Sequence, residues 1–311
     1  MERVLSTLSW QVCLVYIDDV ILYNPDLPSH LASLDNVLSC LGGAGLKLKP
    51  KKCFLIRKQV HFLGHVVSSE GVATDPDKIA AVQNWAQPTS VTEVRSFLGL
   101  ASYYRRFVPN FAEIARPLVQ LTEKSTQFLW GEAQESAFQK LKTSLTQSPV
   151  LVYPCEGGDF ILDTDASNFG IGAVLSQIQE GEEKVLAYAS RALTKQERRY
   201  CVTRKELLAV VYFTQYFKHF LLGRPFTIRT DHASLKWLKS FKEPEGQLAR
   251  WMEIIGGYDF HIEHRPGKEH GNADALSRGP CTQCGGSHDS DPSWPSQTLT
   301  APKSLGQCPE K

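Results

Sequence analysis

The 311-residue chain lacks a long apolar run, an N-terminal signal sequence and a pattern of paired cysteines. No apolar stretch reaches the ~20 residues that a membrane-spanning helix needs, and the N-terminus, Met1 to Ser6, has no secretory pattern. The eight cysteines are mostly scattered, which favours reduced intracellular thiols over a disulfide framework. These absences argue against a membrane-spanning or secreted protein, and we expect no membrane partner.

Acidic residues are missing from residues 41–69, although the whole sequence has a net charge of +1. This stretch instead carries the basic residues Lys47, Lys49, Lys51, Lys52, Arg57 and Lys58. Such a patch suits a phosphate backbone, and a solvated lysine-rich loop fits the pattern equally well. Near the other end, Cys281, Cys284 and His288 are similar to part of a zinc knuckle. Cys308 is too distant to be the usual fourth ligand, so we expect a tail cysteine pair rather than a zinc site.

The length and the 42% hydrophobic content suggest two or more domains with their own cores. Residues 4–9 are expected to end a helix, and residues 11–17 read as a buried strand. Residues 20–23 resume the strand pattern, which predicts a hairpin with Asp18 and Asp19 at its tip. Further along we expect a helix at residues 29–42 and a strand or hairpin at residues 60–67, bent at Gly64.

The middle of the chain, about residues 75–147, reads as helices. Asp75-Pro76 predicts an N-cap followed by proline at the first helical position. Ser90 and Glu93 form a capping-box pattern before the apolar face of the next helix. Another helix is expected at residues 132–147.

From Val150 the pattern changes to strands with one long helix. The predicted strands are residues 160–164, 170–175, 185–189 and 226–230, and the helix spans about residues 203–222. This order predicts one mixed sheet covered by helices. From Gly279 onward Pro, Ser and Gly dominate, which predicts a disordered tail.

Four acidic residues stand where such elements begin or end. Asp165 and Asp231 close strand-like runs, whereas Glu206 and Asp274 open helix-like ones. These are rigid positions from which side chains can converge, and carboxylate oxygens are the hard ligands that Mg²⁺ prefers. The pattern indicates magnesium-dependent cutting of a nucleic-acid strand. Helix capping is an alternative for Glu206 and Asp274, and Asp163, on the same strand face as Asp165, is a second candidate ligand.

Several short motifs follow one another in a specific order. Tyr16-Ile-Asp-Asp19 resembles the signature of reverse transcriptases, Phe62-Leu-Gly-His65 a primer-grip hairpin, and the run from Arg95 to Phe107 a thumb helix. Thr164-Asp-Ala-Ser167, Lys205-Glu-Leu-Leu-Ala-Val210, Thr230-Asp-His232 and Asn272-Ala-Asp-Ala-Leu-Ser-Arg278 resemble a tethered ribonuclease H domain. Together, over about residues 1–278, the chain resembles the Pol polyprotein of gypsy-type LTR retrotransposons.

The resemblance implies a multidomain α+β and α/β fold. We expect the C-terminal part of a reverse transcriptase palm at residues 1–72, a helical thumb and connection at 73–150, a ribonuclease H-like mixed sheet flanked by helices at 151–278, and a disordered tail at 279–311. The family's third palm carboxylate and its fingers are expected upstream of this chain, so the polymerase site should be incomplete. An upstream palm and fingers segment or a dimer partner would complete it, and the isolated chain should incorporate no measurable nucleotide. Because such elements visit both compartments, we expect a cytoplasmic or nuclear protein.

By the same resemblance, the ribonuclease H metal ligands are Asp165, Glu206, Asp231 and Asp274. They would hold Mg²⁺, or alternatively Mn²⁺, for hydrolysis of the RNA strand of an RNA–DNA hybrid, with two ions about 4 Å apart. Because clustered carboxylates repel each other, at least one pKa should rise without metal. His264, ten residues before Asp274, is expected to assist proton transfer or product release. A surface role for His264, or His270 in its place, is the alternative.

In the polymerase part, the resemblance makes Asp18 and Asp19 metal ligands for nucleotidyl transfer, although Asp also favours simple turns. The expected template-primer contacts are Tyr16, Lys49, Lys51, Lys52, Leu63, Gly64, Arg95, Arg105 and Arg106. Arg198, Arg199, Arg204 and Lys205 either bind the hybrid backbone or form an exposed basic helix start. The alternative function for the whole chain is a catalytically inactive, nucleic-acid-binding remnant of a retroelement.

Overall fold

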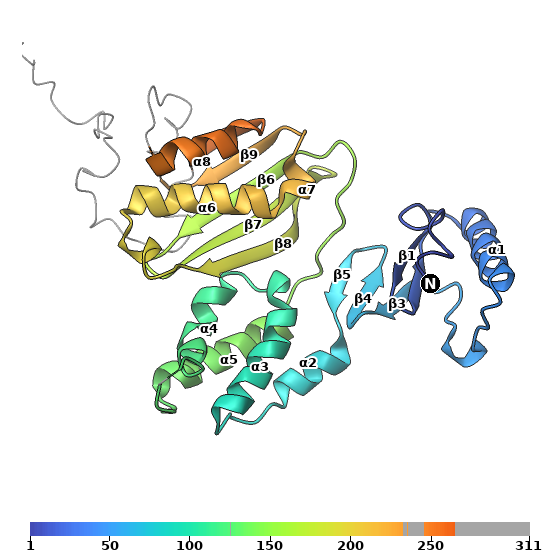
Figure 1. The fold of residues 1–311 in the computed structure, drawn as a ribbon, viewed down its shortest axis with the longest axis horizontal. Coiled ribbons are helices and arrows are strands. Elements are labelled where there is room, and N and C mark those ends of the chain that lie inside the picture. The colour runs from blue at the N-terminus through green and yellow to red at the C-terminus, as the bar shows by residue number, and fades with distance from the viewer. Residues whose placement is uncertain (125, 233–234, 236–245, 265–311) are drawn as a thin grey trace, which may run out of the picture.

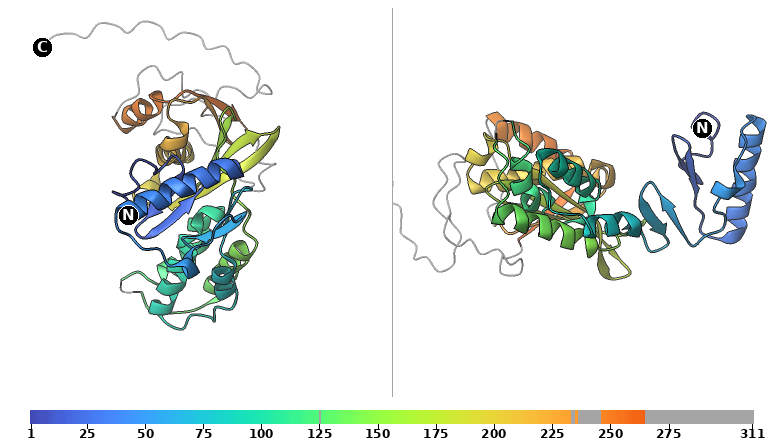
Figure 2. Two further views of the ribbon diagram at one scale, coloured as in Figure 1. Left: turned by 90° about the vertical axis from the view of Figure 1, so that its right-hand side faces the viewer. Right: turned by 90° about the horizontal axis from the view of Figure 1, so that it is seen from below.

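The computed structural model describes residues 1–124, 126–232, 235 and 246–264, which form an elongated molecule (Figure 1, Figure 2). Three hydrophobic clusters organise the described residues: one N-terminal, one helical and one built on a five-stranded sheet. The N-terminal unit lies at one end of the molecule (Figure 2). Asp274, His270 and the tail cysteines lie outside the described residues, so the predictions made for them stay predictions.

The N-terminal unit is a β-hairpin packed with one helix. β1 (Cys13–Tyr16) pairs antiparallel with β2 (Asp19–Leu22), and Tyr16 faces Asp19, so Ile17 and Asp18 form the turn. α1 (Leu27–Gly43) begins at Asp26, whose carboxylate accepts the Ser29 N–H. The predicted helix end at residues 4–9 is wrong. The Leu5 carbonyl accepts the N–H groups of Leu8 and Ser9, which closes turns rather than a helix.

A small sheet connects this unit to the helices. It consists of β3 (Gln59–Phe62), β4 (His65–Ser68) and β5 (Val72–Thr74), preceded by the short helix η1 (Pro50–Lys52). Leu63 and Gly64 form the turn between β3 and β4, with φ angles of 47° and 65°. This left-handed conformation favours glycine, so the predicted bend at Gly64 is confirmed.

The helical unit contains α2 (Pro76–Gln83), α3 (Val91–Tyr103), η2 (Arg105–Phe107), α4 (Phe111–Gln120) and α5 (Glu132–Thr146). Asp75 caps α2 by accepting the Asp77 N–H, as predicted. The Ser90 hydroxyl accepts the Glu93 N–H, but the Glu93 carboxylate accepts from Thr89 rather than from Ser90. The second hydrogen bond of the capping box is therefore made to Thr89, one residue before the cap residue Ser90.

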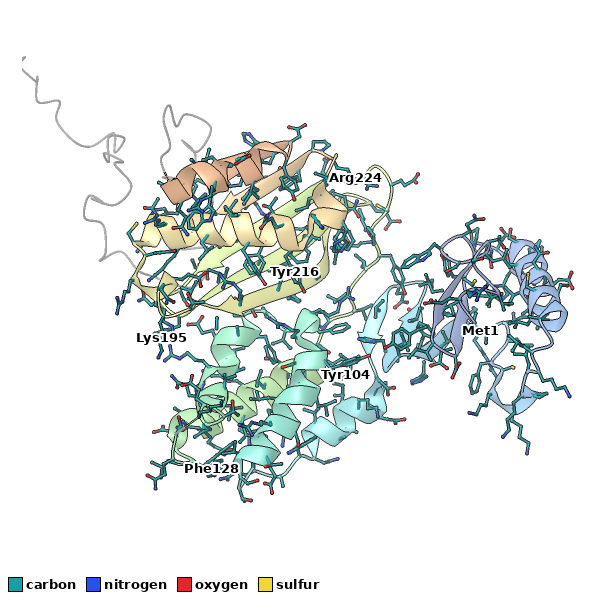
Figure 3. The ribbon with its side chains drawn as sticks, viewed as in Figure 1. Met1, Tyr104, Phe128, Lys195, Tyr216 and Arg224 are labelled. Carbon is teal, nitrogen blue, oxygen red and sulfur yellow. The ribbon has the colours of Figure 1, made fainter. Side chains whose placement is uncertain are left out.

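Tyrosines at the end of α3 hold the β3–β4 turn against the helical unit. The buried Tyr104 hydroxyl donates to the Gly64 carbonyl at 2.6 Å, and the Tyr103 hydroxyl donates to the Leu63 carbonyl. Burial raises the pKa of Tyr104 to about 12. Figure 3 labels Tyr104 at this junction. The hairpin and the helical unit are thus tied at two successive main-chain positions.

The C-terminal sheet has the order β10-β9-β6-β7-β8. Its strands are β6 (Phe160–Ala166), β7 (Gly170–Gln179), β8 (Glu182–Ala192), β9 (Phe226–Thr230) and β10 (Phe260–His264). β9 runs parallel to β6 and β10, whereas β7 runs antiparallel to β6 and β8. The predicted mixed sheet is therefore confirmed, and β10 is a strand that the sequence did not predict.

Helices cover one face of this sheet (Figure 1). α6 (Val202–Tyr216) and α8 (Gly246–Gly256) contribute to the same apolar core as the strands, and α7 (Lys218–Leu221) follows α6. The single helix predicted at residues 203–222 is wrong in extent, because it divides at Phe217. Among the described helices, none is both long and apolar enough to cross a membrane.

The helical unit packs on the other face of β7 and β8. Tyr188 of β8 contacts the helical core. The Ser190 hydroxyl accepts the Ala112 N–H at 2.9 Å, and its carbonyl accepts from Arg105. The Arg116 guanidinium lies 3.6 Å from the centre of the Phe169 ring. These contacts give the sheet a second supporting layer, and they cover its edge strand.

Candidate metal centre

Three of the predicted acids converge at one edge of the sheet. Asp165 lies near the end of β6, Asp231 directly follows β9, and Glu206 lies in the second turn of α6. β6 and β9 are adjacent and parallel, so their ends reach the same edge. Ligand oxygens of the three carboxylates lie within 4.8 Å of one another. Hard oxygen donors in this arrangement suit a divalent cation such as Mg²⁺.

Glu206 is the buried member of the cluster, with 3% of its surface exposed. Its Oε1 accepts the Ala166 N–H at 3.2 Å, and its Oε2 has no hydrogen-bond partner among the described residues. Burial raises the pKa of Glu206 well above its usual value, and the nearby charges of Asp165 and Asp231 raise it further. The predicted rise of one carboxyl pKa is therefore present. Because Glu206 contacts the main chain of β6, it does not cap its own helix.

Two histidines surround Asp231. The Nε2 atom of His264, at the end of β10, lies 2.9 Å from the Asp231 carbonyl. Since a carbonyl only accepts, the Nε2 atom donates this hydrogen bond. His232 Nε2 lies 2.9 Å from the Thr203 hydroxyl of α6. His264 was expected in a loop. Its place on a paired strand instead fixes it beside the Asp231 main chain.

The competing candidate, Asp163, is engaged elsewhere. Its carboxylate receives two hydrogen bonds from Arg229, which also pairs with Glu183. Burial lowers the pKa of Arg229, but the hydrogen bonds and charges of the two carboxylates outweigh it and raise that pKa. The arrangement therefore brings Asp165, and not Asp163, into the carboxylate cluster.

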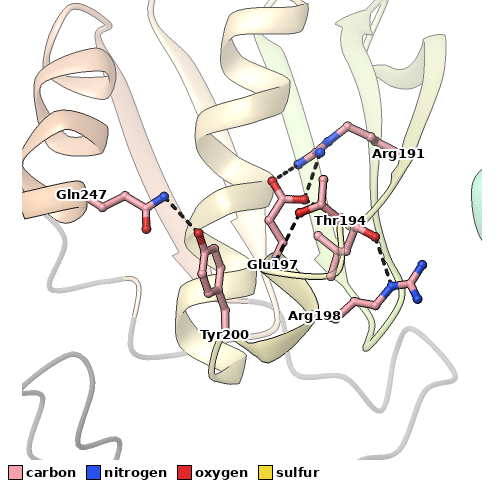
Figure 4. Close-up of polar contacts among 7 residues, drawn as sticks. Arg191, Thr194, Glu197, Arg198, Tyr200 and Gln247 are labelled. Atoms are coloured by element: carbon pink, nitrogen blue, oxygen red, sulfur yellow. Dashed lines mark hydrogen bonds and ion pairs between the residues drawn. The ribbon is translucent and has the colours of Figure 1, made fainter.

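The connection from β8 to α6 is held by polar contacts (Figure 4). Arg191 makes a two-point ion pair with Glu197 of η3 (Glu197–Arg199), and Arg198 donates to the Leu193 carbonyl at 3.1 Å. Burial opposes the ionisation of Glu197, yet hydrogen bonds from Arg191 and Thr194 lower its pKa overall. These contacts fix the start of the helix that carries Glu206.

Two of the basic residues at the start of α6 make contacts within the protein, whereas Arg199 is exposed and its contact with a hybrid stays a prediction. Arg204 donates to the Gln247 side chain. Gln247 in turn donates to the Tyr200 hydroxyl (Figure 4). Lys205 is buried and donates to Asn168. Lys205 is thus neither a surface contact for a hybrid nor part of an exposed helix start, because its aliphatic stem and ammonium lie inside the fold.

The residues predicted for the polymerase part lie in the N-terminal unit, the small sheet and the helical unit, apart from the carboxylate cluster. Asp18 and Asp19 are exposed at the β1–β2 turn beside Tyr16, and Ile17 there has a φ of 54°. This conformation is strained for a β-branched residue. Lys49, Lys51 and Lys52 are also exposed. Arg95 donates to the Thr122 carbonyl, Arg105 to Ser190, and Arg106 lies over the Phe107 ring. Their contacts with nucleic acid stay predictions.

The sequence reasoning missed two interactions near the cluster. Arg229 stands two residues before Asp231, just as Asp163 stands two residues before Asp165. In neighbouring parallel strands this matched spacing places opposite charges side by side, so the sequence carried a signal for the ion pair. The Lys205–Asn168 contact had none, because a lysine at a helix start is normally exposed.

Two families match this chain. Residues 1–67 match the family described as reverse transcriptase (RNA-dependent DNA polymerase), and residues 157–258 match the RNase H-like domain found in reverse transcriptase. The retrovirus-related Pol polyprotein from transposon 297 of Drosophila melanogaster is 42% identical over 279 residues, which cover 89% of this chain and 26% of that protein. The chain belongs to the Pol polyproteins of gypsy-type transposons.

One further relative and two solved structures are similar to this chain. The retrovirus-related Pol polyprotein from transposon gypsy of the same fly is 37% identical over 291 residues, covering 89% of this chain and 28% of that protein. The chain thus spans about a quarter of the length of these relatives. The foamy viral protease-reverse transcriptase, solved with an RNA/DNA hybrid, has a TM-score of 0.70 at 23% identity, covering 94% of this chain and 39% of that one. A second foamy viral structure, with double-stranded DNA, has a TM-score of 0.73 at 23% identity, covering 88% of this chain and 48% of that one. The multidomain α+β fold expected from the sequence is confirmed.

Proposed function

We propose that the sheet unit is a ribonuclease H that hydrolyses the RNA strand of RNA–DNA hybrids with divalent metal ions. The observation that carries this proposal is the cluster of Asp165, Glu206 and Asp231, whose ligand oxygens lie within 4.8 Å of one another. Three carboxylates placed this close together repel one another, which makes a purely structural role costly. In a nuclease site, bound cations would offset this negative charge.

The donor set fits a hard cation. Glu206 directs a buried oxygen without a hydrogen-bond partner among the described residues, and coordination would satisfy it. Asp165, Glu206 and Asp231 would hold the metal, and Asp274 is proposed as a further ligand. Bound Mg²⁺, or Mn²⁺, would activate the attacking water and stabilise the leaving oxygen of an in-line displacement.

The surrounding residues orient the ligands and handle protons. The Ala166 N–H fixes one oxygen of Glu206, which leaves the other directed to the cluster. His264 holds the main chain of Asp231 through Nε2. Because this hydrogen bond fixes the ring beside the carboxylate cluster, we assign His264 to proton transfer or product release. Asp163 is excluded from ligation by its ion pair with Arg229.

An RNA–DNA hybrid is the proposed substrate, with template-primer as a further partner. A related fold, the foamy viral protease-reverse transcriptase, was solved with an RNA/DNA hybrid. Proteins recognise such duplexes by shape, phosphates and 2′-hydroxyls rather than by base sequence. In the reverse-transcriptase part we propose Asp18 and Asp19 as metal ligands, because both are exposed at the tip of a tight turn.

The test is cleavage of an end-labelled RNA–DNA hybrid with Mg²⁺ by the whole chain. We expect cleavage by the wild type and none by Asp231→Asn. Asp163→Asn serves as the matched control, since it removes an acid from the same strand face and should keep cleavage. Its thermal midpoint should fall, because the ion pair with Arg229 is lost.

Each outcome has a distinct meaning. Cleavage by the wild type and Asp163→Asn but not by Asp231→Asn supports the assigned cluster. Loss of cleavage in folded Asp163→Asn would exchange the roles of the two acids. No cleavage by folded wild type would favour the alternative, a nucleic-acid-binding remnant without activity.

A further inference from the structure

Lys205 is a buried cation beside the carboxylate cluster. Only 6% of its surface is exposed, and its ammonium donates to the Asn168 side-chain oxygen at 2.9 Å. Burial lowers the pKa of Lys205. Among the described residues, no carboxylate lies within ion-pair distance of its ammonium. Burying an ammonium against a neutral amide is unfavourable. The contact therefore needs a role in the protein that offsets this cost.

Asn168 belongs to the tight connection between β6 and β7, three residues after Asp165. Within this connection the Ser167 hydroxyl accepts the N–H groups of Phe169 and Gly170. Phe169 lies under the guanidinium groups of Arg116 and Arg198. The connection is therefore fixed from three sides: by its own serine, by two arginines, and by Lys205.

Successive residues of α6 bind this one segment. Lys205 contacts Asn168, and Glu206 accepts the Ala166 N–H. The two contacts lie on either side of Ser167, so they prevent α6 from sliding or rotating relative to the end of β6. That relation sets the separation between the Glu206 and Asp165 carboxylates, which is the geometry a cation requires.

Lys205 cannot act by touching the nucleic acid, because its side chain lies inside the fold. Charge neutralisation of the acids is also a poor explanation, since neither Asp165 nor Glu206 forms an ion pair with it among the described contacts. What remains is the directional hydrogen bond to Asn168.

We propose that Lys205 is a positioning residue for the metal centre, which acts through Asn168 to fix the β6–β7 connection and hence the distance from Asp165 to Glu206. This inference rests on the proposed metal-dependent function of the cluster. It assigns a role in metal affinity to a residue that contacts neither metal nor substrate.

The experiment compares Lys205→Met, Asn168→Leu and Asn168→Asp with the wild type in the whole chain. Two readouts are taken: the Mg²⁺ concentration for half-maximal hybrid cleavage, and the rise of the thermal midpoint on adding Mg²⁺. Lys142→Met is the matched control, because Lys142 also donates to a neutral oxygen, the Trp85 carbonyl, but in the helical unit. Asn168 is exposed, so its variants test the contact even if Lys205→Met fails to fold.

Lys205→Met and Asn168→Leu should raise the half-maximal Mg²⁺ concentration about 10–100-fold, the usual effect of losing a residue that orients a metal ligand. The KM for hybrid at saturating Mg²⁺ should stay unchanged. Asn168→Asp keeps an acceptor for the ammonium and should behave like the wild type, as should Lys142→Met. The double variant of Lys205→Met with Asn168→Leu should be no worse than either single variant.

Unchanged Mg²⁺ dependence in folded Lys205→Met or Asn168→Leu would overturn the inference. A wild type that gains stability with Mg²⁺ but cleaves no hybrid would refute the proposed function alone, and loss of that gain in Asn168→Leu would still support the positioning role. A wild type that neither cleaves nor responds to Mg²⁺ would overturn both.

Discussion

Glu206→Gln should make the metal-free protein more stable while abolishing metal-dependent cleavage. Glu206 is buried, one of its oxygens has no hydrogen-bond partner among the described residues, and two further carboxylates lie within 4.8 Å. A glutamine amide has the same shape and can keep the acceptor for the Ala166 N–H. Its NH₂ group can donate to the neighbouring carboxylates, so a repulsive contact becomes an attractive one.

The magnitude follows from the unpartnered atom. Leaving a buried polar group without a partner costs about 1–3 kcal/mol, and we expect Glu206→Gln to recover roughly this amount without metal. For a unit of this size that is a rise in thermal midpoint of at least about 2 °C. With Mg²⁺ the order should reverse, because ligand binding stabilises only the protein that can coordinate it.

The pH dependence of stability gives an independent check on whether Glu206 stabilises or destabilises the fold. The folded-state pKa of Glu206 lies above its usual value of 4.5. Between 4.5 and that raised pKa the folded protein holds a proton that the unfolded chain has lost. The contribution of Glu206 to stability therefore falls as pH rises through this window, and the full penalty is present above the folded pKa. Glu206→Gln should remove this slope.

The assay is thermal unfolding in EDTA and in Mg²⁺ at several pH values, together with hybrid cleavage. Glu183→Gln is a suitable control, because Glu183 belongs to the separate ion pair with Arg229 and its loss should destabilise in both conditions. If folded Glu206→Gln were less stable than the wild type in EDTA, the Glu206 carboxylate would not be a strained, metal-ready ligand.

Further predictions concern the residues that hold the acids and the β3–β4 turn. His264→Ala should slow hybrid cleavage about 10–100-fold, whereas Asp165→Asn should abolish it; equal rates for His264→Ala and wild type would remove the histidine from the mechanism. Tyr104→Phe removes the donor to the part-buried Gly64 carbonyl and should cost about 0.5–1.5 kcal/mol of stability, measured by denaturant unfolding, with hybrid cleavage unaffected. An unchanged denaturation midpoint for Tyr104→Phe would contradict a stabilising role of that hydroxyl.

The elements that the sequence predicted well carry their own local signals. Asp75-Pro76 begins α2, and the Leu63-Gly64 bend is the turn between β3 and β4. β10 and α8 were not predicted, because their sequences lack such local signals. β10 alternates Phe260 and Ile262 with charged or polar residues over only five positions, and it exists as a strand because it pairs with β9. Such non-local pairing is weakly encoded in any short segment.

The residues of the candidate site also differ in whether a local sequence signal marks them. Asp165, Glu206 and Asp231 were found from the sequence because each ends or begins an element within a motif. Their support was not found, because it depends on contacts between distant segments. Lys205 reaches Asn168 across 37 positions, and His264 reaches the Asp231 carbonyl across 33. A helix-start lysine and a loop histidine have ordinary surface explanations until the sheet brings their partners close.

Charge pairing across β6 and β9 explains why this edge of the sheet, and not merely a number of acids, indicates a cation site. The two strands run parallel in a register that pairs Asp163 with Arg229. Two residues further along the chain stand Asp165, in β6, and Asp231, directly after β9. Asp163 and Arg229 therefore neutralise each other, whereas Asp165 and Asp231 bring like charges close together. The closeness of Asp165, Asp231 and buried Glu206 supports the cation site proposed above.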